Sequence, residues 1–231
     1  MKRIGCLVPY TNYTVEQEIQ YLFESGFLST KDICFHFARL MTKTRYSTNE
    51  YEYLSQLNKS TEDTLGQLNP LQLDACAFFC TSAGLLGKDF FDHVITAIDS
   101  LQSACKYVNM QKCMLITPYT QEIGKSIAEQ IKKSGITILC SKHLNLRHSE
   151  DYVSYGYNEL YDYILENYEK KYGDIVISCT NLPTFHLIEK LESDLDITVI
   201  TSNQSILWFV LSDLYITHAT HGIGSLLRRN L

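Results

Sequence analysis

The feature that most constrains this sequence is an internal duplication. Three short patterns occur twice and in the same order: Pro-Tyr-Thr after an apolar run, Cys-Thr after an apolar run, and Val-Ile-Thr. The paired residues lie 109, 99 and 105 positions apart, and the pairs are Pro9 and Pro118, Cys80 and Cys179, and Val94 and Val199. Chance matches would not preserve both order and spacing. The duplication predicts two related halves, and a pseudo-twofold axis between them would bring the two cysteines face to face across a cleft.

Each half alternates between strand and helix patterns, which is typical of a parallel sheet flanked by helices. The first half is expected to have strands at residues 4–8, 33–37 and 73–79, a helix at 15–25, and a long helix that ends at Leu68. The second half is expected to have strands at 114–117, 136–140 and 175–178, and helices at 122–133, 158–171 and 204–214. We therefore predict an α/β fold with two pseudo-symmetric lobes, each a mostly parallel sheet flanked by helices, and an active site in the cleft between them.

The predicted first lobe comprises residues 1–96 together with 215–231, and the predicted second lobe comprises residues 97–214. The chain has 231 residues, so each lobe would have roughly 100 residues, which is a usual domain size. A hydrophobic content of 45% is enough for a proper core. Because no linker rich in Gly, Ser or Pro separates the lobes, we expect them to pack together.

Charge and hydropathy exclude two classes of partner. The net charge is −6 with no long run of either sign, whereas binding nucleic acid requires a basic stripe. No apolar stretch reaches the ~18 residues of a membrane span. The chain enters a strand at Ile4 without a signal-peptide pattern, so we expect a cytoplasmic protein with its eight cysteines reduced. Sixteen tyrosines suggest a packed or interfacial surface and little more. We expect a homo-oligomer, dimeric or larger.

Cys80 and Cys179 are the strongest candidates for chemistry. Each follows a buried strand and precedes polar residues, at the strand end where open α/β sheets bind ligands. A thiol at a helix N-terminus has a lowered pKa, which would supply thiolate near neutral pH. Either cysteine alone is more typical of a core residue, but the matched Cys-Thr pairs favour a functional pair. Two opposed thiols suit a reaction on both faces of one carbon.

Polar residues directly after the two cysteines are candidate substrate contacts. Thr81 and Ser82 follow the first cysteine, and Thr180 and Asn181 follow the second. Backbone N–H groups and hydroxyls at helix starts can bind a carboxylate without an arginine. The same residue types also cap helices, and both readings remain open from the sequence.

Two further candidates end the first strands of the two halves. Asn12 and Tyr119 fall at the same sheet edge as the cysteines, where an amide or a phenol could donate to a substrate oxygen; the alternative is a simple turn. The sequence has no GxGxxG, P-loop or pyridoxal-lysine pattern, so no cofactor is expected. His218 and His221 lack a third ligand, so no metal is expected.

Five segments together resemble one known superfamily. They are Val-Pro-x-x-Asn-x-x-x-Glu at residues 8–16, Cys80-Thr81-Ser82, Thr117-Pro118-Tyr119, residues 178–184 and residues 199–204. In this order they resemble the aspartate/glutamate racemase superfamily, and most closely its branch of maleate cis-trans isomerases and arylmalonate decarboxylases. The resemblance covers nearly the whole chain. It implies two pseudo-symmetric α/β lobes with a cofactor-free site between them.

The resemblance also implies roles for the matching residues. Cys80 matches the cysteine that adds to the alkene in maleate isomerases, and Cys179 matches the cysteine that handles the proton. In racemases the two exchange acid and base roles. Asn12 and Tyr119 match contacts to the substrate carboxylates. Because arylmalonate decarboxylases lack the first-half cysteine, Cys80 argues against decarboxylation.

We predict a cofactor-independent isomerase of a small (di)carboxylate that uses two opposed cysteines, similar to maleate cis-trans isomerase. One alternative is an aspartate/glutamate-type amino-acid racemase with a two-base cysteine mechanism. An alternative of another class is a catalytically silent carboxylate-binding protein. One loop departs from the maleate isomerase pattern: Ser149 or Glu150 replaces the usual asparagine, and a glutamate would repel a dicarboxylate.

Overall fold

The computed structural model describes residues 1–43, 50–85, 93–219 and 222–228. Its first sheet contains β1 (Lys2–Pro9), β2 (Ile33–Leu40), β3 (Ala75–Phe78) and β4 (Ile95–Thr96), in the spatial order β2-β1-β3-β4. Its second sheet contains β5 (Lys112–Thr117), β6 (Thr137–His143), β7 (Asp174–Ile177) and β8 (Val199–Thr201), in the order β6-β5-β7-β8. All neighbouring strands are parallel. Since both sheets have the same order and direction, the predicted α/β class with two pseudo-symmetric halves is confirmed.

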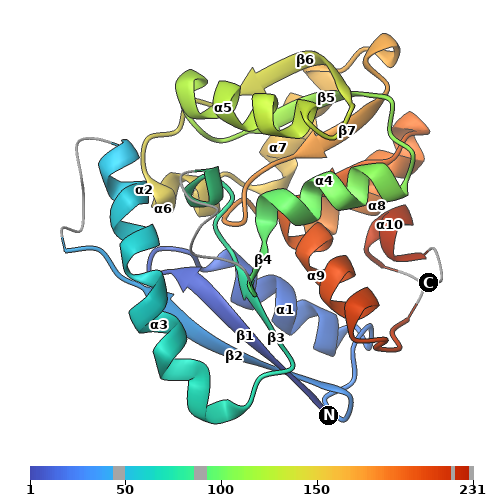
Figure 1. Cartoon of the computed structure of the whole chain (residues 1–231). Coiled ribbons are helices and arrows are strands. Elements are labelled where there is room, and N and C mark those ends of the chain that lie inside the picture. The colour runs from blue at the N-terminus through green and yellow to red at the C-terminus, as the bar shows by residue number, and fades with distance from the viewer. Residues whose placement is uncertain (44–49, 86–92, 220–221, 229–231) are drawn as a thin grey trace.

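Helices surround both sheets (Figure 1). Between β1 and β5 the chain forms α1 (Thr14–Glu24), α2 (Glu50–Lys59), α3 (Thr61–Leu68) and α4 (Ala97–Tyr107). The second half contributes α5 (Gln121–Lys132), α6 (Ser149–Ser154), α7 (Tyr157–Asn167), α8 (Phe185–Leu195), α9 (Ser202–Asp213) and α10 (Gly224–Arg228). Helices α4 and α9, which follow the last strands of their sheets, pack against each other and join the two halves.

The repeated Val-Ile-Thr pattern has the same structural role in both halves. Its threonine ends the last strand of each sheet and caps the helix that follows. The Thr96 hydroxyl accepts a hydrogen bond from the N–H of Asp99 at 3.2 Å, and the Thr201 hydroxyl accepts one from the N–H of Gln204 at 3.4 Å. A capping hydroxyl satisfies one of the N–H groups that a helix start leaves unpaired. The first residues of α9 are thereby fixed beside the end of β7.

The central strands are apolar on both faces because helices cover both faces of each sheet. Every residue of β1 from Ile4 to Pro9 is buried, and so is every residue of β5 from Cys113 to Thr117. These strands end at the carboxyl edges of the two sheets, and the polar turns that follow them form the inner surface between the halves. The buried apolar strands thus determine where the polar turns that follow them lie.

The long helix expected to end at Leu68 is two helices instead. α2 ends at Lys59 and α3 begins at Thr61. At the break the Ser60 hydroxyl donates to the carbonyl of Leu57 at 2.8 Å, and the Thr64 hydroxyl donates to the carbonyl of Ser60 at 2.6 Å. Hydroxyl side chains that bond to nearby carbonyls compete with the helical backbone bonds. The apolar stripe continues across the break, which is why the sequence pattern does not reveal it.

The assignment of residues 215–231 to the first lobe stays a prediction. In the structure, α10 packs against α8 and α9 of the second half, while the N–H of Ala219 donates to the carbonyl of Phe27 in the first half at 3.0 Å.

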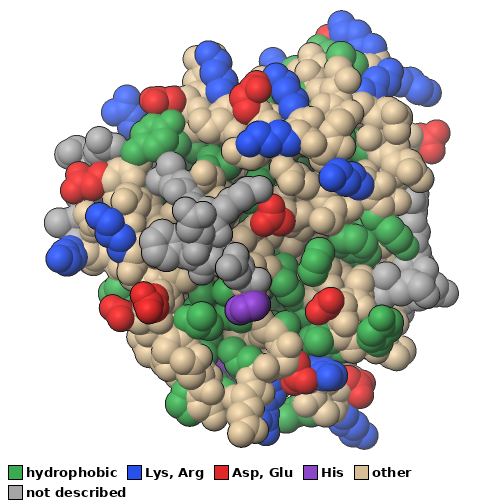
Figure 2. Space-filling view, viewed as in Figure 1, with side chains coloured by type: hydrophobic (Ala, Val, Ile, Leu, Met, Phe, Trp, Pro, Cys, Tyr) green, Lys and Arg blue, Asp and Glu red, His purple; other side chains and the backbone are tan. Residues whose placement is uncertain are grey.

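None of the helices in the described part of the chain combines the length and apolar character needed to cross a membrane. On the face shown in Figure 2, Lys and Arg side chains are interspersed with acidic and uncharged ones.

Candidate active site

A cleft of about 660 Å³ lies between the two halves, at the carboxyl ends of their central strands. Its lining includes the turn after β1, residues of α2, the turn after β3, the turn after β5, the loop before α6 and the turn after β7. The residues are Pro9, Tyr10, Thr11, Asn12, Tyr53, Leu54, Cys80, Ser82, Tyr119, Thr120, Glu122, Leu146, Arg147, His148, Ser149, Glu150, Tyr152, Cys179, Thr180 and Asn181. The structure thus brings both predicted cysteines into one cleft, together with five of the six predicted binding residues.

The sulfur of Cys179 is surrounded by hydrogen-bond donors. The N–H of Asn181 donates to it at 3.3 Å. Burial raises the pKa of this thiol to about 12, against hydrogen bonds from the Tyr119 hydroxyl and the N–H groups of Asn181 and Leu182, which lower it. A negative charge on Cys80 also raises this pKa. The two sulfurs are therefore close enough for the charge of one to affect the other.

Cys80 lies in an equivalent turn. The Ser82 hydroxyl oxygen lies 3.8 Å from its sulfur. Burial raises the pKa of Cys80, while the N–H groups of Ala83 and Ser82 and the Ser82 hydroxyl lower it. In both turns the N–H groups of the second and third residues after the cysteine point at its sulfur. The expectation of lowered thiol pKa values is nevertheless wrong, because burial outweighs these donors at both cysteines.

Asn12 connects the two halves next to the cysteines. Its Nδ2 donates to the hydroxyl of Thr180 at 3.1 Å, and its Oδ1 accepts from the N–H of Val15 at 3.2 Å. The Thr180 hydroxyl in turn donates to the carbonyl of Phe79 at 2.8 Å. Both predicted binding residues line the cleft, and both also hold the turns of the two cysteines against each other.

Asn181 uses its amide to hold two neighbouring elements. Its Oδ1 accepts from the N–H of Tyr13 at 3.1 Å, before α1, and its Nδ2 donates to the carbonyl of Ser149 at 2.9 Å, at the start of α6. Thr81 is the predicted binding residue that does not line the cleft. It is buried, and its hydroxyl oxygen lies 3.0 Å from that of Ser202.

Tyr119 places a phenol beside Cys179. Burial raises its pKa far above the ordinary value, and negative charge on Cys179 or Cys80 raises it further. The phenol therefore stays neutral and is a hydrogen-bond donor. Its ring packs edge-on against that of Tyr152, with 5.8 Å between the ring centroids. This packing fixes the direction in which the hydroxyl points.

Several lining residues were not singled out from the sequence. The Thr11 hydroxyl donates to the Ser149 hydroxyl at 2.9 Å and lies 3.3 Å from the hydroxyl oxygen of Tyr53. Arg147 adds a cation to the wall formed by the loop before α6. Tyr53 and Arg147 belong to no repeated pattern, so the duplication gave no signal for them. The sequence identifies Ser149 only as a possible replacement for the family's asparagine.

The described residues contain no group of three or more His, Cys, Asp or Glu side chains that could hold a metal ion. His221, one of the two histidines with metal-like spacing, lies outside the described residues.

Comparison with known proteins places the chain in a family. Residues 93–227, more than half of the chain, match the sequence model of the family described as arylmalonate decarboxylase. The maleate isomerase of Geobacillus stearothermophilus is 22% identical over 245 residues, which cover 97% of this chain and 96% of that protein.

Two solved structures have similar folds. A Nocardia farcinica maleate cis-trans isomerase, a cysteine-to-serine variant with a covalently bound succinylcysteine intermediate, superposes with a TM-score of 0.86 at 19% identity over 100% of this chain and 99% of that one. A glycine-to-cysteine variant of arylmalonate decarboxylase superposes with a TM-score of 0.76 at 16% identity over 98% of this chain and 100% of that one. These matches confirm the resemblance inferred from the sequence motifs, and the chain belongs to the arylmalonate decarboxylase family.

Proposed function

We propose that the protein is a cofactor-independent cis-trans isomerase of a small dicarboxylate of the maleate type. The observation that carries the proposal is the placement of Cys80 and Cys179 in equivalent turns on one cleft. Each turn directs two N–H groups at its sulfur. A reaction that adds a sulfur to one carbon of an alkene and a proton to the other needs two such groups. The maleate isomerases among the relatives support the same assignment.

The reaction begins with the Cys80 thiolate as nucleophile. Its sulfur forms a bond to one alkene carbon, and the π electron pair moves to the neighbouring carbon, which takes the proton of the Cys179 thiol. The product is a succinyl thioether on Cys80 and a thiolate on Cys179. Rotation about the new carbon–carbon single bond interchanges the cis and trans arrangements. Cys179 then removes the proton, the carbon–sulfur bond breaks, and the trans alkene leaves with Cys80 restored as thiolate.

The groups around the sulfurs fit these two roles. The Ser82 and Ala83 N–H groups stabilise negative charge on Cys80 before attack, and the Asn181 and Leu182 N–H groups do so on Cys179 after it has lost its proton. The neutral phenol of Tyr119 reaches the Cys179 sulfur as a further donor. The Ser82 hydroxyl, the Asn12 amide and Arg147 are the proposed contacts of the substrate carboxylates.

The alternatives predict different chemistry in the same cleft. A two-base racemase would use both cysteines for proton transfer and form no carbon–sulfur bond, and a silent binding protein would have no turnover. Neither alternative is favoured by the maleate isomerase relatives. A cytoplasmic location and homo-oligomeric assembly stay predictions.

Proton NMR with a substrate panel tests the proposal. The purified protein is incubated in deuterated buffer with maleate, citraconate, aspartate, glutamate or an arylmalonate. We expect loss of the maleate vinyl signal and growth of the fumarate signal. Exchange at the α-carbon of an amino acid without isomerisation would instead indicate a racemase, and carbon dioxide release from an arylmalonate would indicate a decarboxylase. No reaction with any member would contradict an enzyme of this substrate class.

A further inference from the structure

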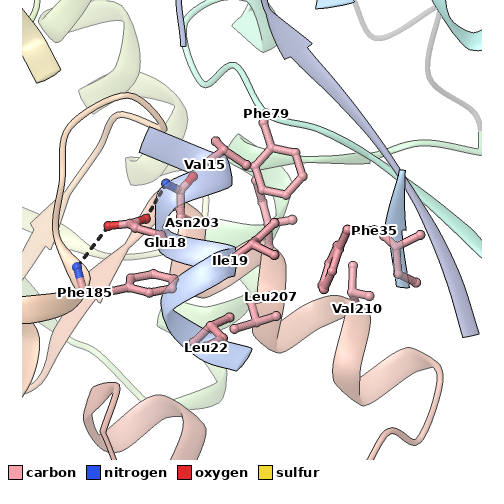
Figure 3. Close-up of a pocket in the computed structure, with 12 residues that line it drawn as sticks. Val15, Glu18, Ile19, Leu22, Phe35, Phe79, Phe185, Asn203, Leu207 and Val210 are labelled. Carbon is pink, nitrogen blue, oxygen red and sulfur yellow. Dashed lines mark hydrogen bonds between the residues drawn. The ribbon is translucent and has the colours of Figure 1, made fainter. Parts of the chain in front are cut away.

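One buried carboxylate is not used by the mechanism above. Glu18 belongs to α1 of the first half and is 6% exposed. It occupies a position in the apolar stripe formed by Val15, Ile19 and Leu22, and its carboxylate points at the start of α8 (Figure 3). Among the described residues that line the small cavity beside it, no other side chain is charged. Burying a carboxylate among apolar side chains costs free energy unless hydrogen-bond donors compensate it. The groups that donate to Glu18 therefore indicate its role.

Among the described residues, the donors that reach the Glu18 carboxylate all come from the second half of the chain. Its Oε1 accepts from the N–H of Thr184 at 2.7 Å, from the hydroxyl of Thr184 at 3.2 Å and from the N–H of Phe185 at 3.0 Å. Its Oε2 accepts from Nδ2 of Asn203 at 2.6 Å. Burial raises the pKa of Glu18 to about 7, while these donors favour the ionised form. Glu18 thus caps the N-terminus of α8 from a different helix. A negative charge is favourable there because the N-terminal end of the helix dipole is positive.

The same contacts hold both ends of the segment that follows Cys179. Asn203 Nδ2 donates to the carbonyl of Thr180 at 2.9 Å as well as to Glu18. Thr184, at the other end of the segment, donates to Glu18 directly. The backbone between Thr180 and Thr184 includes the Asn181 and Leu182 N–H groups that stabilise the Cys179 sulfur. Glu18 therefore holds both ends of the backbone segment that carries those two N–H groups.

We propose that Glu18 is a positioning residue for Cys179, acting through Asn203 and Thr184 to hold the 180–184 segment so that its N–H groups face the sulfur. The expected change in kcat for maleate rests on the proposed function. The structural consequence, the accessibility and reactivity of the Cys179 thiol, does not depend on the substrate.

Glu18→Gln is the sharpest variant because it keeps the size and shape of the side chain while it changes the hydrogen-bonding pattern and removes the ionisable group. The amide oxygen can still accept from Thr184 and Phe185, but the amide nitrogen then faces Nδ2 of Asn203, donor against donor. Asn203 can relieve this only by rotating its amide, and the rotation removes Nδ2 from the carbonyl of Thr180.

Glu192→Gln is the matched control. Glu192 is a second buried glutamate, 7% exposed. It accepts from the N–H of Val199 at 3.1 Å and from the N–H of Ser225 at 2.7 Å, and it pairs with Arg228. It joins α8 to β8 and α10, not to the 180–184 segment. Any general loss of stability from replacing a buried glutamate by glutamine therefore appears in both variants.

The experiment measures alkylation of each cysteine by iodoacetamide, using peptide mass spectrometry, together with kcat and KM for maleate. We expect Glu18→Gln to raise the alkylation rate of Cys179 at least about fivefold and that of Cys80 less than about twofold, because only the Cys179 turn loosens. We expect kcat to fall roughly 10- to 100-fold with KM changed less than about threefold. Glu192→Gln should leave both alkylation rates and kcat near the wild-type values.

Equal changes at both cysteines, or identical behaviour of the two glutamine variants, would overturn the proposal. If wild-type protein does not isomerise maleate, the proposed function fails but the alkylation comparison still decides the role of Glu18. If Glu18→Gln does not fold, Asn203→Ala removes the contact to Thr180 while leaving Glu18 bonded to Thr184 and Phe185. That variant should show the same selective rise at Cys179, and an unchanged Cys179 rate in it would equally overturn the proposal.

Discussion

Cys80 and Cys179 lie in turns of the same form but have different additional donors. Beside Cys80 lies the hydroxyl of Ser82, which belongs to the same turn. Cys179 instead accepts a hydrogen bond from the hydroxyl of Tyr119, which belongs to the turn after β5. Both thiols have raised pKa values because burial outweighs the donors. The thiolates are thus a minor form near neutral pH, and the N–H groups set how large that minor form is.

The raised pKa of Cys179 predicts a distinct pH profile of alkylation. With a pKa of about 12, the thiol remains mostly protonated up to pH 9, so its thiolate fraction rises about tenfold per pH unit. We therefore expect the iodoacetamide rate at Cys179 to increase about tenfold from pH 7 to 8 and again from pH 8 to 9. A free cysteine peptide, whose pKa is about 8.5, is the control and should level off. A plateau for Cys179 below pH 9 would contradict this prediction.

At the residue scale, the sequence predicted eight site residues, and the structure brings seven of them, both cysteines included, to the cleft. Their signal was repetition, because a duplicated fold places equivalent turns on one axis. Glu18 has no equivalent in the repeat. The one sequence signal for it is a carboxylate within an apolar helical stripe, and that signal does not identify partners such as Asn203, which lies 185 positions away.

The caps of α4 and α9 show how the duplication extends to single elements. Thr96 and Thr201 end the last strand of each sheet and accept from the N–H three residues later. The Val-Ile-Thr repeat marks both positions in the sequence, although no strand was predicted at either of them. The sequence did not predict the division between α2 and α3, because hydroxyl bonds at Ser60 leave the apolar period unchanged.

Removing either cap is expected to destabilise the fold by a similar amount. Thr96→Val and Thr201→Val keep the shape of the side chain but lose the accepting hydroxyl, which should lower the free energy of unfolding by about 1 kcal/mol each. Urea denaturation monitored by circular dichroism provides the measurement. A valine variant as stable as the wild type would show that the corresponding hydroxyl is not a working cap.

The two halves of the molecule are held together by polar groups as well as by the packing of α4 on α9. Asn12, Glu18 and Asn181 each bond across the boundary between the halves. Glu18 is the buried titratable member of this set, and its pKa of about 7 lies above the ordinary value of 4.5. Ionisation of Glu18 therefore couples the stability of the whole molecule to pH.

The sign of this coupling follows from the raised pKa. The folded protein holds the Glu18 proton more tightly than the unfolded chain, so this contribution to stability is complete below pH 4.5 and is lost as pH rises through about 7. The loss amounts to about 3 kcal/mol. We expect the stability of the wild type relative to Glu18→Gln to decrease between pH 5 and 7 and to stay constant above pH 8. Urea titrations of both proteins at each pH measure it, and a difference independent of pH would contradict the assigned pKa.

The mechanism assigns covalent bond formation to Cys80 and proton transfer alone to Cys179. Intact-protein mass spectrometry after incubation with maleate distinguishes these roles. We expect Cys179→Ser to retain an adduct of one maleate mass, located on Cys80 by peptide mapping, and Cys80→Ser to show neither adduct nor turnover. Full isomerase activity in both serine variants, or an adduct that maps to Cys179, would rule out this division of roles between the two cysteines.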